Sequence, residues 1–307
     1  MQGILTGFAI IGVVIAAGYL AARLRVGGPD AREALNRVGF FVASPALLFT
    51  VVADADLGEL LGAPLLVQAV AAASAAACFV VVNLLWFRLR APEATIGALG
   101  AGYVNAGNIG LPVAVYVLDD ATAVVPVIGM QLLIVSPLVL LLLDSTTSER
   151  RVSLGFVLSQ PVRNPIILGA LAGAAVSLTG ATVPDVVLAP LEILGGAAIP
   201  MILLAFGMSL RGSRPLRGEE GRGPVVVAAQ LKAVLMPAVA FVVARYGFAL
   251  DDAAVVSAVT LAALPTAQNI YNYAARFRRG EVLARDTILV TTLASPVVLL
   301  AAAALLS

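Results

Sequence analysis

Segments of about 20 mostly apolar residues, the length at which an α-helix crosses a bilayer, follow one another along almost the whole chain. Of its 307 residues, 61% are hydrophobic and only 12% are charged, and the mean hydropathy is +1.02. A water-soluble domain of this size has no way to cover so much apolar surface. The sequence therefore predicts an all-α membrane protein whose solvent is the lipid bilayer. Ten transmembrane helices are predicted, at residues 3–22, 38–53, 64–87, 94–117, 122–143, 162–180, 190–210, 225–247, 253–276 and 285–306.

The charged residues between these segments alternate in sign from one loop to the next. Every basic residue except Arg245 and Lys232 falls in or beside one set of loops, whereas the opposite loops carry acidic residues such as Asp54, Asp120 and Asp251. Cytoplasmic loops are enriched in Lys and Arg. The alternation therefore predicts a multi-pass protein of the plasma membrane with both termini outside.

The composition argues against several classes of function. The chain has no histidine and a single cysteine, Cys78, and no catalytic pair or set of metal ligands stands at membrane depth. The basic residues are scattered singly instead of forming a stripe for nucleic acid, and no Gly-rich nucleotide-binding loop occurs. A channel would show a continuous polar stripe or a ring of charges, and neither is evident. We therefore expect no enzyme activity, no cofactor, no metal and no nucleic-acid partner.

The second half of the chain repeats the first. Short matches recur in the same order about 160 residues apart. They are Val135-Ser-Pro-Leu-Val-Leu-Leu-Leu142 with Ala294-Ser-Pro-Val-Val-Leu-Leu-Ala301, Pro64 with Pro224, Pro45 with Pro200, and Val104-Asn-Ala-Gly-Asn-Ile109 with Pro265-Thr-Ala-Gln-Asn-Ile270. A unit of five helices is odd in number, so its second copy must enter the membrane inverted. We expect repeats at 1–143 and 162–307, joined by a short cytoplasmic linker at 144–161, which is an arrangement typical of secondary transporters.

Two segments at membrane depth are unsuited to a continuous helix. The fourth predicted span contains Tyr103-Val-Asn-Ala-Gly-Asn-Ile-Gly-Leu-Pro112, and the ninth contains Leu264-Pro-Thr-Ala-Gln-Asn-Ile-Tyr-Asn-Tyr273. Interrupted membrane helices must be buried in protein or line a cavity, and their half-helix N-termini attract anions. The residues expected to break the helices are Gly107, Gly110, Pro112 and Pro265, and the expected substrate ligands are Asn105, Asn108, Pro265, Thr266, Gln268 and Asn269. The alternative is that these residues only pack helices together.

Lys232, the only lysine, is predicted within the eighth span. Charges inside a membrane usually serve function, so Lys232 is a candidate for neutralising an anionic substrate. The alternative is that its long side chain reaches the cytoplasmic headgroups. Gln131, Ser136 and Ser295 are either neighbours of the site or helix–helix contacts. No carboxylate stands near either interrupted segment, which argues against a sodium site built on Glu or Asp.

The chain resembles the auxin efflux carrier (PIN-like) family of the bile-acid/sodium-symporter-like superfamily. The resemblance covers essentially the whole chain. It rests on Asn105-Ala-Gly-Asn-Ile-Gly-Leu-Pro112, Asn164-Pro165, Ile199-Pro-Met-Ile-Leu-Leu-Ala-Phe-Gly207, Lys232 with Pro237, and Leu264-Pro265. It implies a scaffold of spans 1, 2, 6 and 7, a mobile transport unit of spans 3–5 and 8–10, and crossing helices 4 and 9. It also implies that Asn105 binds the substrate carboxylate, that Pro265 marks the crossover, and that the protein forms a homodimer through the scaffold. Plant members have a proline where this chain has Val104.

The function expected from these features is secondary transport of a small organic carboxylate anion by an elevator-type alternating-access mechanism, either as a uniporter or coupled to protons. The alternative is a sodium-coupled organic anion carrier similar to the bile-acid symporters. Binding that requires sodium would distinguish the second from the first.

Overall fold

The computed structural model describes the chain except residues 1, 57, 59–61, 148–162, 212–221 and 307. Most of the predicted linker at 144–161 therefore lies outside the described residues. Throughout the described part the secondary structure is helical, with a single isolated β-bridge between Val104 and Thr266 and no strand. The prediction of an all-α membrane protein is confirmed.

Seven helical segments in the described part of the chain are long and apolar enough to cross a membrane. They are Thr6–Arg23, Ala31–Ala53, Ala63–Phe87, Ala121–Thr146, Asp185–Ser209, Arg222–Gly247 and Glu281–Ala302. These correspond to the first, second, third, fifth, seventh, eighth and tenth predicted spans. The sixth is the shorter apolar helix α11 (Pro165–Thr179). The fourth and ninth are interrupted, so neither forms one long helix, and the count of ten stays a prediction.

Prolines explain several local irregularities in the long helices. Four wide π-helical turns, η1 (Gly39–Ala43), η3 (Ala106–Gly110), η5 (Gln131–Val135) and η6 (Leu231–Leu235), each end two residues before a proline. These prolines are Pro45, Pro112, Pro137 and Pro237. A proline has no N–H to donate and its ring clashes with the carbonyl four residues earlier. The preceding turn widens into a π-helical turn, and helical residues continue through the proline.

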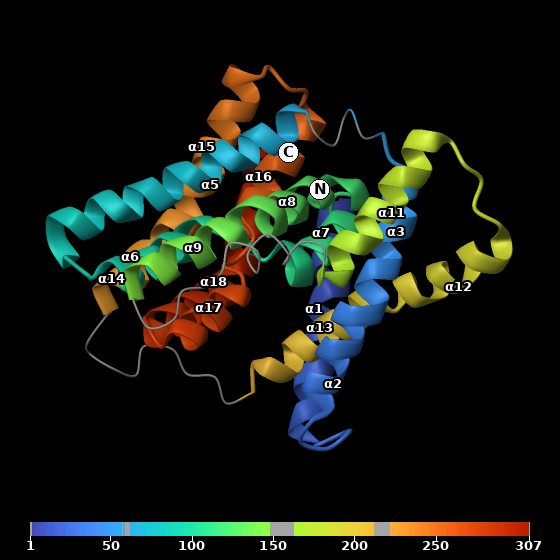
Figure 1. Ribbon diagram of the computed structural model, residues 1–307, viewed down its shortest axis with the longest axis horizontal. Coiled ribbons are helices and arrows are strands. Elements are labelled where there is room, and N and C mark those ends of the chain that lie inside the picture. Colours follow the sequence, from blue (N-terminus) through green and yellow to red (C-terminus); the bar gives the residue numbers. More distant parts are fainter. Residues whose placement is uncertain (1, 57, 59–61, 148–162, 212–221, 307) are drawn as a thin grey trace.

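The helices form two groups that lie side by side (Figure 1). In the first group, α3 packs against α11 and α12, and α13 packs against α1 and α2. Its members are α1 (Gln2–Arg23), α2 (Ala31–Val38), η1, α3 (Ser44–Ala53), α11, α12 (Asp185–Gly196) and α13 (Ala198–Ser209).

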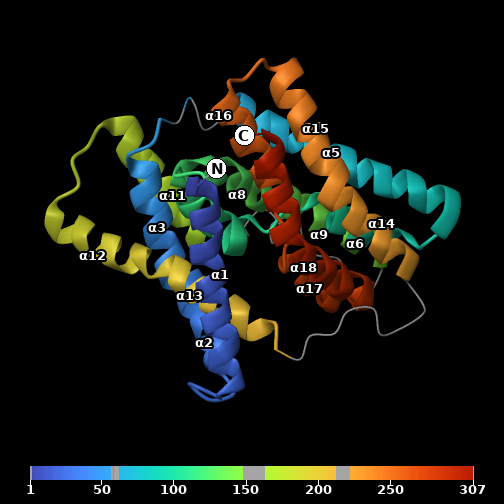
Figure 2. The ribbon, with the colours of Figure 1, turned by 180° about the vertical axis from the view of Figure 1, so that it is seen from behind.

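The second group contains the two interrupted spans. In it, α5 packs against α6, α15 and α16, while α14 and α17 pack against α18, and the reverse view shows the same division (Figure 2). Its members are α5 (Ala63–Val82), η2 (Asn83–Phe87), α6 (Ala91–Gly102), η3, α7 (Leu111–Tyr116), η4 (Ala121–Val124), α8 (Val125–Met130), η5, α9 (Ser136–Thr147), α14 (Arg222–Gln230), η6, α15 (Met236–Val242), η7 (Val243–Gly247), α16 (Asp252–Ala262), α17 (Asn269–Phe277) and α18 (Glu281–Leu306).

Two glycines let α1 and α13 approach closely within the first group. A Cβ atom at Gly18 would lie 2.3 Å from the carbonyl oxygen of Leu204, and one at Gly207 would lie 2.0 Å from the carbonyl oxygen of Ile15. Both separations are far inside van der Waals contact, so only glycine allows this backbone-to-backbone packing. The two groups meet where α1 packs against α7 and α13 packs against η3. The interrupted segment at η3 therefore lies at the boundary between the groups.

Candidate functional site

The two interrupted spans cross and are joined through their backbones. Helix α6 ends at Gly102 and is followed by an extended segment, whereas α16 ends at Ala262 and is followed by a turn and then an extended segment. The backbone N–H of Asn105 donates to the carbonyl of Pro265 (2.8 Å), and that of Ala267 donates to the carbonyl of Tyr103 (3.0 Å). This reciprocal pair forms the β-bridge between Val104 and Thr266. Each interruption thereby supplies partners for backbone groups that the other has freed.

Side chains complete the hydrogen bonding of the crossing. The Thr266 hydroxyl donates to the carbonyl of Gly100 (2.7 Å), and the Thr266 N–H donates to the Thr291 hydroxyl (3.1 Å). The Gln131 amide donates to the carbonyl of Val104 (2.9 Å). All three side chains are buried. The crossing is therefore held in place from α6, η5 and α18 as well as from its own backbone.

Asn105 ends the first interruption and caps the helix that follows. Its Oδ1 accepts a hydrogen bond from the N–H of Asn108 (3.2 Å), which is the usual role of an asparagine N-cap. This contact orients the amide, because only its oxygen can accept from an N–H. The Nδ2 is buried and has no hydrogen-bond partner among the described residues. A buried donor without a partner is costly, so the crossing presents a donor suited to an anionic oxygen.

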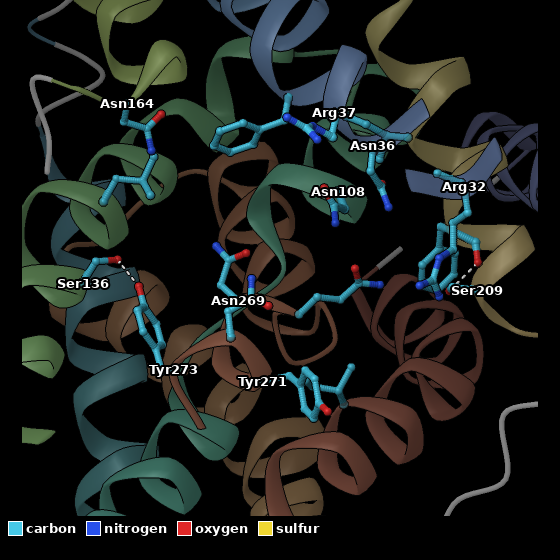
Figure 3. A pocket seen from close by; sticks show the side chains of 18 of the residues that line it. Arg32, Asn36, Arg37, Asn108, Ser136, Asn164, Ser209, Asn269, Tyr271 and Tyr273 are labelled. Carbon is cyan, nitrogen blue, oxygen red and sulfur yellow. Dashed lines mark hydrogen bonds between the residues drawn. The ribbon is translucent and has the colours of Figure 1, made fainter. Parts of the chain in front are cut away.

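A cavity of about 890 Å³ opens beside the crossing, between the two helix groups. From the second group it is lined by residues of η3, η5, α9, α17 and α18, and from the first group by residues of α2, η1, α11 and α13. Figure 3 shows Asn108 and Asn269 near the centre of the view, Asn36 and Arg37 on one side, and Ser136 with Tyr273 on another. The N-terminal ends of η3 and α17 both reach this cavity through Asn108, Gln268 and Asn269.

The lining of the cavity is basic and polar. Its four charged residues are Arg32, Arg37, Arg276 and Arg285, and no aspartate or glutamate is among the described residues that line it. Arg285 pairs with the neighbouring Asp286 (2.8 Å), and Arg37 lies 3.9 Å from Glu33 across an exposed helix turn. The described part of the chain contains no cluster of three His, Cys, Asp or Glu side chains that could hold a metal ion. The arginines that line the cavity make its electrostatic environment positive, which favours anions.

A group of hydroxyls forms one wall of the cavity. The Tyr273 hydroxyl donates to the Ser136 hydroxyl (2.7 Å), which also contacts the Tyr103 hydroxyl (3.3 Å). Ser136 and Tyr273 line the cavity, whereas Tyr103 is buried behind them. These hydroxyls link α9, α17 and the end of α6 and present neutral hydrogen-bonding groups to a bound molecule.

The ligands expected from the sequence are divided between three positions. Asn108, Gln268 and Asn269 line the cavity. Asn105, Pro265 and Thr266 form the crossing and are not among the residues that line the cavity, and Asn105 and Thr266 are buried. Lys232 is buried elsewhere, and it is not among the residues that line this cavity.

The residues expected to break the helices also have distinct positions. Pro265 lies in the extended segment after α16, but Gly107, Gly110 and Pro112 lie within η3 and α7, after the interruption. A Cβ at Gly110 would lie 2.9 Å from Val124, so this glycine serves close packing.

Sequence reasoning did not assign the arginines, Tyr271, Asn272 or Tyr273 to the site. The arginines were used only to orient the loops, although their presence on α2, α17 and α18 was visible. Of the proposed neighbours, Gln131 bonds the crossing, Ser136 lines the cavity, and Ser295 bonds the carbonyl of Thr292 within its own helix.

A comparison with known proteins assigns the chain to a family. The model of a family described as "Membrane transport protein" matches residues 4–301. The chain belongs to this family, the auxin efflux carriers. The match extends over both groups of helices and both interrupted spans. The resemblance noted from the sequence is thereby confirmed, and the protein is a membrane transporter.

A relative within this transporter family is also known from a bacterium. The chain is 30% identical over 285 residues to a protein of Rhizobium meliloti (strain 1021) named "Putative malonate transporter". The alignment covers 91% of this chain and 88% of the relative. The two proteins are therefore similar over nearly their full lengths.

Proposed function

We propose that this transporter carries a small organic anion with one or more carboxylates across the plasma membrane. The observation that carries the proposal is the cavity lined by four arginines. Asn108 also lines it, and its N–H donates to Asn105, whose amide nitrogen is buried and unpartnered. A carboxylate entering between Asn108 and Asn269 would accept a hydrogen bond from Asn105 Nδ2, and charge-assisted bonds of this kind are strong. Malonate is the first substrate to test, because the bacterial relative is named as a transporter of it.

We further propose an elevator-type mechanism with ten spans in two inverted repeats. The first helix group would be the scaffold, and the second group, which contains the crossing, would be the moving transport unit. The close glycine-mediated packing of α1 against α13 supports a rigid scaffold. The hydrogen bonds that tie α6, η5 and α18 to the crossing support a transport unit that moves as one body. Transport would be uniport or coupled to protons.

The charge distribution supports an assignment of sidedness. The four cavity arginines belong to loops and helix ends that the positive-inside rule assigns to the cytoplasm. With both termini outside, the cavity would open toward the cytoplasm, and the structure would represent an inward-facing conformation.

Ligand binding tests the proposed function directly. Detergent-purified protein is heated with and without malonate, succinate, acetate and a neutral diamide of malonate, in sodium-containing and sodium-free buffer. A ligand that binds only the folded state raises the melting temperature. We expect stabilisation by at least one carboxylate in both buffers and none by the diamide. If no carboxylate stabilises the protein while the diamide does, the anion proposal is wrong. Stabilisation only in sodium would support the sodium-coupled alternative.

We expect the double substitution Arg32→Gln/Arg37→Gln to slow anion entry from the cytoplasmic side. Both arginines lie on α2 and line the cavity from the first helix group. Charges at the rim of a site mainly steer a charged ligand, and salt screens this effect. Malonate uptake into inside-out vesicles should fall a few-fold at low ionic strength and recover at high ionic strength.

Arg245→Gln is the matched control for this loss of charge. Arg245 pairs with Asp252 and does not line the cavity, so its removal should leave uptake unchanged at both ionic strengths. An equal loss of uptake at low and high salt in the double variant would contradict a steering role.

A further inference from the structure

Lys232 is enclosed within the second helix group, and only 1% of it is exposed. It lies in η6, which packs against α5, α6 and α18. Its Nζ donates to the carbonyl of Ala262, the last residue of α16, over 2.6 Å. The ion pairs found among the described residues do not include Lys232. The ammonium therefore reaches neither the headgroups nor the cavity, and its partner is the end of an interrupted helix.

The carbonyl that Lys232 binds lacks its helical partner because of the interruption. In a continuous helix the carbonyl of Ala262 would accept from the N–H of Thr266. That N–H instead donates to the Thr291 hydroxyl, because the chain turns away at Pro265. The carbonyl of Leu261 is affected in the same way. Its helical donor would be the N–H of residue 265, but Pro265 has no N–H. It accepts a hydrogen bond from the N–H of Leu264 instead (3.3 Å). The end of α16 is therefore a point where backbone carbonyls need donors from elsewhere.

The helix ends that meet at the crossing favour opposite charges, and they face different surroundings. The helix N-termini, which favour negative charge, reach the cavity at Asn108 and Asn269. The C-terminus of α16, which favours positive charge, faces Lys232. In transporters with interrupted helices, such half-helix C-termini and their freed carbonyls are the groups that hold a coupling cation. Here that position is filled by a side chain of the protein itself.

We propose that the Lys232 ammonium is a built-in cation that takes the place of an exchangeable metal cation at the end of α16. A tethered cation stabilises the crossing in every step of transport and is never released. Binding of the anion on the other side of the crossing would then need no sodium, whichever anion is carried. This role makes Lys232 a positioning residue rather than a ligand of the substrate.

Chemical rescue of Lys232→Ala tests the proposal in purified protein. The substitution leaves a void beside an unpartnered carbonyl, and we expect the melting temperature to fall by about 5 °C. Methylammonium chloride at about 100 mM should restore part of this loss, because methylammonium carries the ammonium donor and adjoining carbon of the removed side chain and is small enough to enter the void. Tetramethylammonium chloride supplies the same ionic strength but has no N–H donor and is too large, so it should not restore stability.

Two further variants make the result decisive. Met236→Ala opens a void one helical turn away on the same span, at a residue that is also 1% exposed, and methylammonium should not stabilise this variant. Lys232→Met keeps an unbranched side chain, one heavy atom shorter, and removes the charge. It should melt well below the wild type, and it remains informative if Lys232→Ala does not fold.

Two results would overturn the proposal. They are a wild-type melting temperature for Lys232→Met, or equal responses of Lys232→Ala and Met236→Ala to methylammonium. Rescue of Lys232→Ala by sodium chloride as well would support it, because the vacated position would then accept a metal cation. Melting temperatures do not require a known substrate, so these results stand apart from any failure of the carboxylate screen.

Discussion

Asn105→Asp is expected to abolish binding of malonate while leaving the fold intact. The aspartate retains an oxygen that can accept from the N–H of Asn108, as Asn105 Oδ1 does in the wild type, so the helix cap is preserved. It replaces the buried, unpartnered Nδ2 donor by a second negatively charged oxygen. A lost charge-assisted hydrogen bond reduces affinity by at least about 10-fold, and repulsion between like charges reduces it further. Isothermal titration of purified protein with malonate measures the change.

Two companion variants separate the causes of this loss. Asn105→Ala removes both the cap and the donor, so it should lose affinity and a little stability. Asn164→Asp places a new carboxylate on the same cavity at another asparagine N-cap, whose Oδ1 accepts from the N–H of Ile166. It measures any general repulsion of anions from the cavity and should have the smaller effect. Wild-type affinity in Asn105→Asp would remove Asn105 from the site.

Gly18→Val is expected to destabilise the protein strongly by separating α1 from α13. The added Cβ would collide with the backbone of Leu204, which has no flexible end that can move aside. Overpacking a tight contact costs typically about 1–3 kcal/mol and more where only backbone is available to shift. The melting temperature in detergent should fall by several degrees, and the monodisperse fraction on size exclusion should shrink.

Gly12→Val is the matched control for this prediction, because Gly12 lies on the same helix with nothing within 4 Å of an added Cβ. Both substitutions place the same β-branched residue in α1, so differences in helix propensity cancel. Equal melting temperatures for the two variants would show that the close approach of α1 and α13 does not contribute to stability.

The hydropathy and backbone chemistry of individual segments made much of the fold predictable. Apolar runs of membrane length gave the positions of seven long helices, because lipid leaves a helix as the simplest way to pair every backbone group. Pro265 and the amide-rich segments correctly indicated where helices are interrupted, since a missing N–H is a property of the residue itself. The prediction was less accurate at the fourth span. There the interruption covers residues 103–105, and Gly107, Gly110 and Pro112 belong to the helix that follows.

The sequence did not predict which polar residues line the cavity and which lie elsewhere around the crossing. Asn105 and Lys232 both appeared as polar residues at membrane depth, and both were expected to contact the substrate. Asn105 caps the N-terminus of η3, which reaches the cavity at Asn108, whereas Lys232 binds the C-terminus of α16 and does not line the cavity. Arg32 and Arg276, which are far apart in the sequence, line one cavity.

Hydropathy, charge alternation and the positions of proline are local properties, and from the sequence alone they specify a helical membrane protein with two interrupted spans. Which side of the crossing each polar residue faces depends on how helices distant in sequence pack against one another. That packing is set by contacts such as those of Gly18 with Leu204 and Thr266 with Gly100. Such contacts join residues far apart in the chain and leave no periodic signal in either segment. Only the three-dimensional arrangement therefore separates the residues that line the cavity from Lys232 at the end of α16.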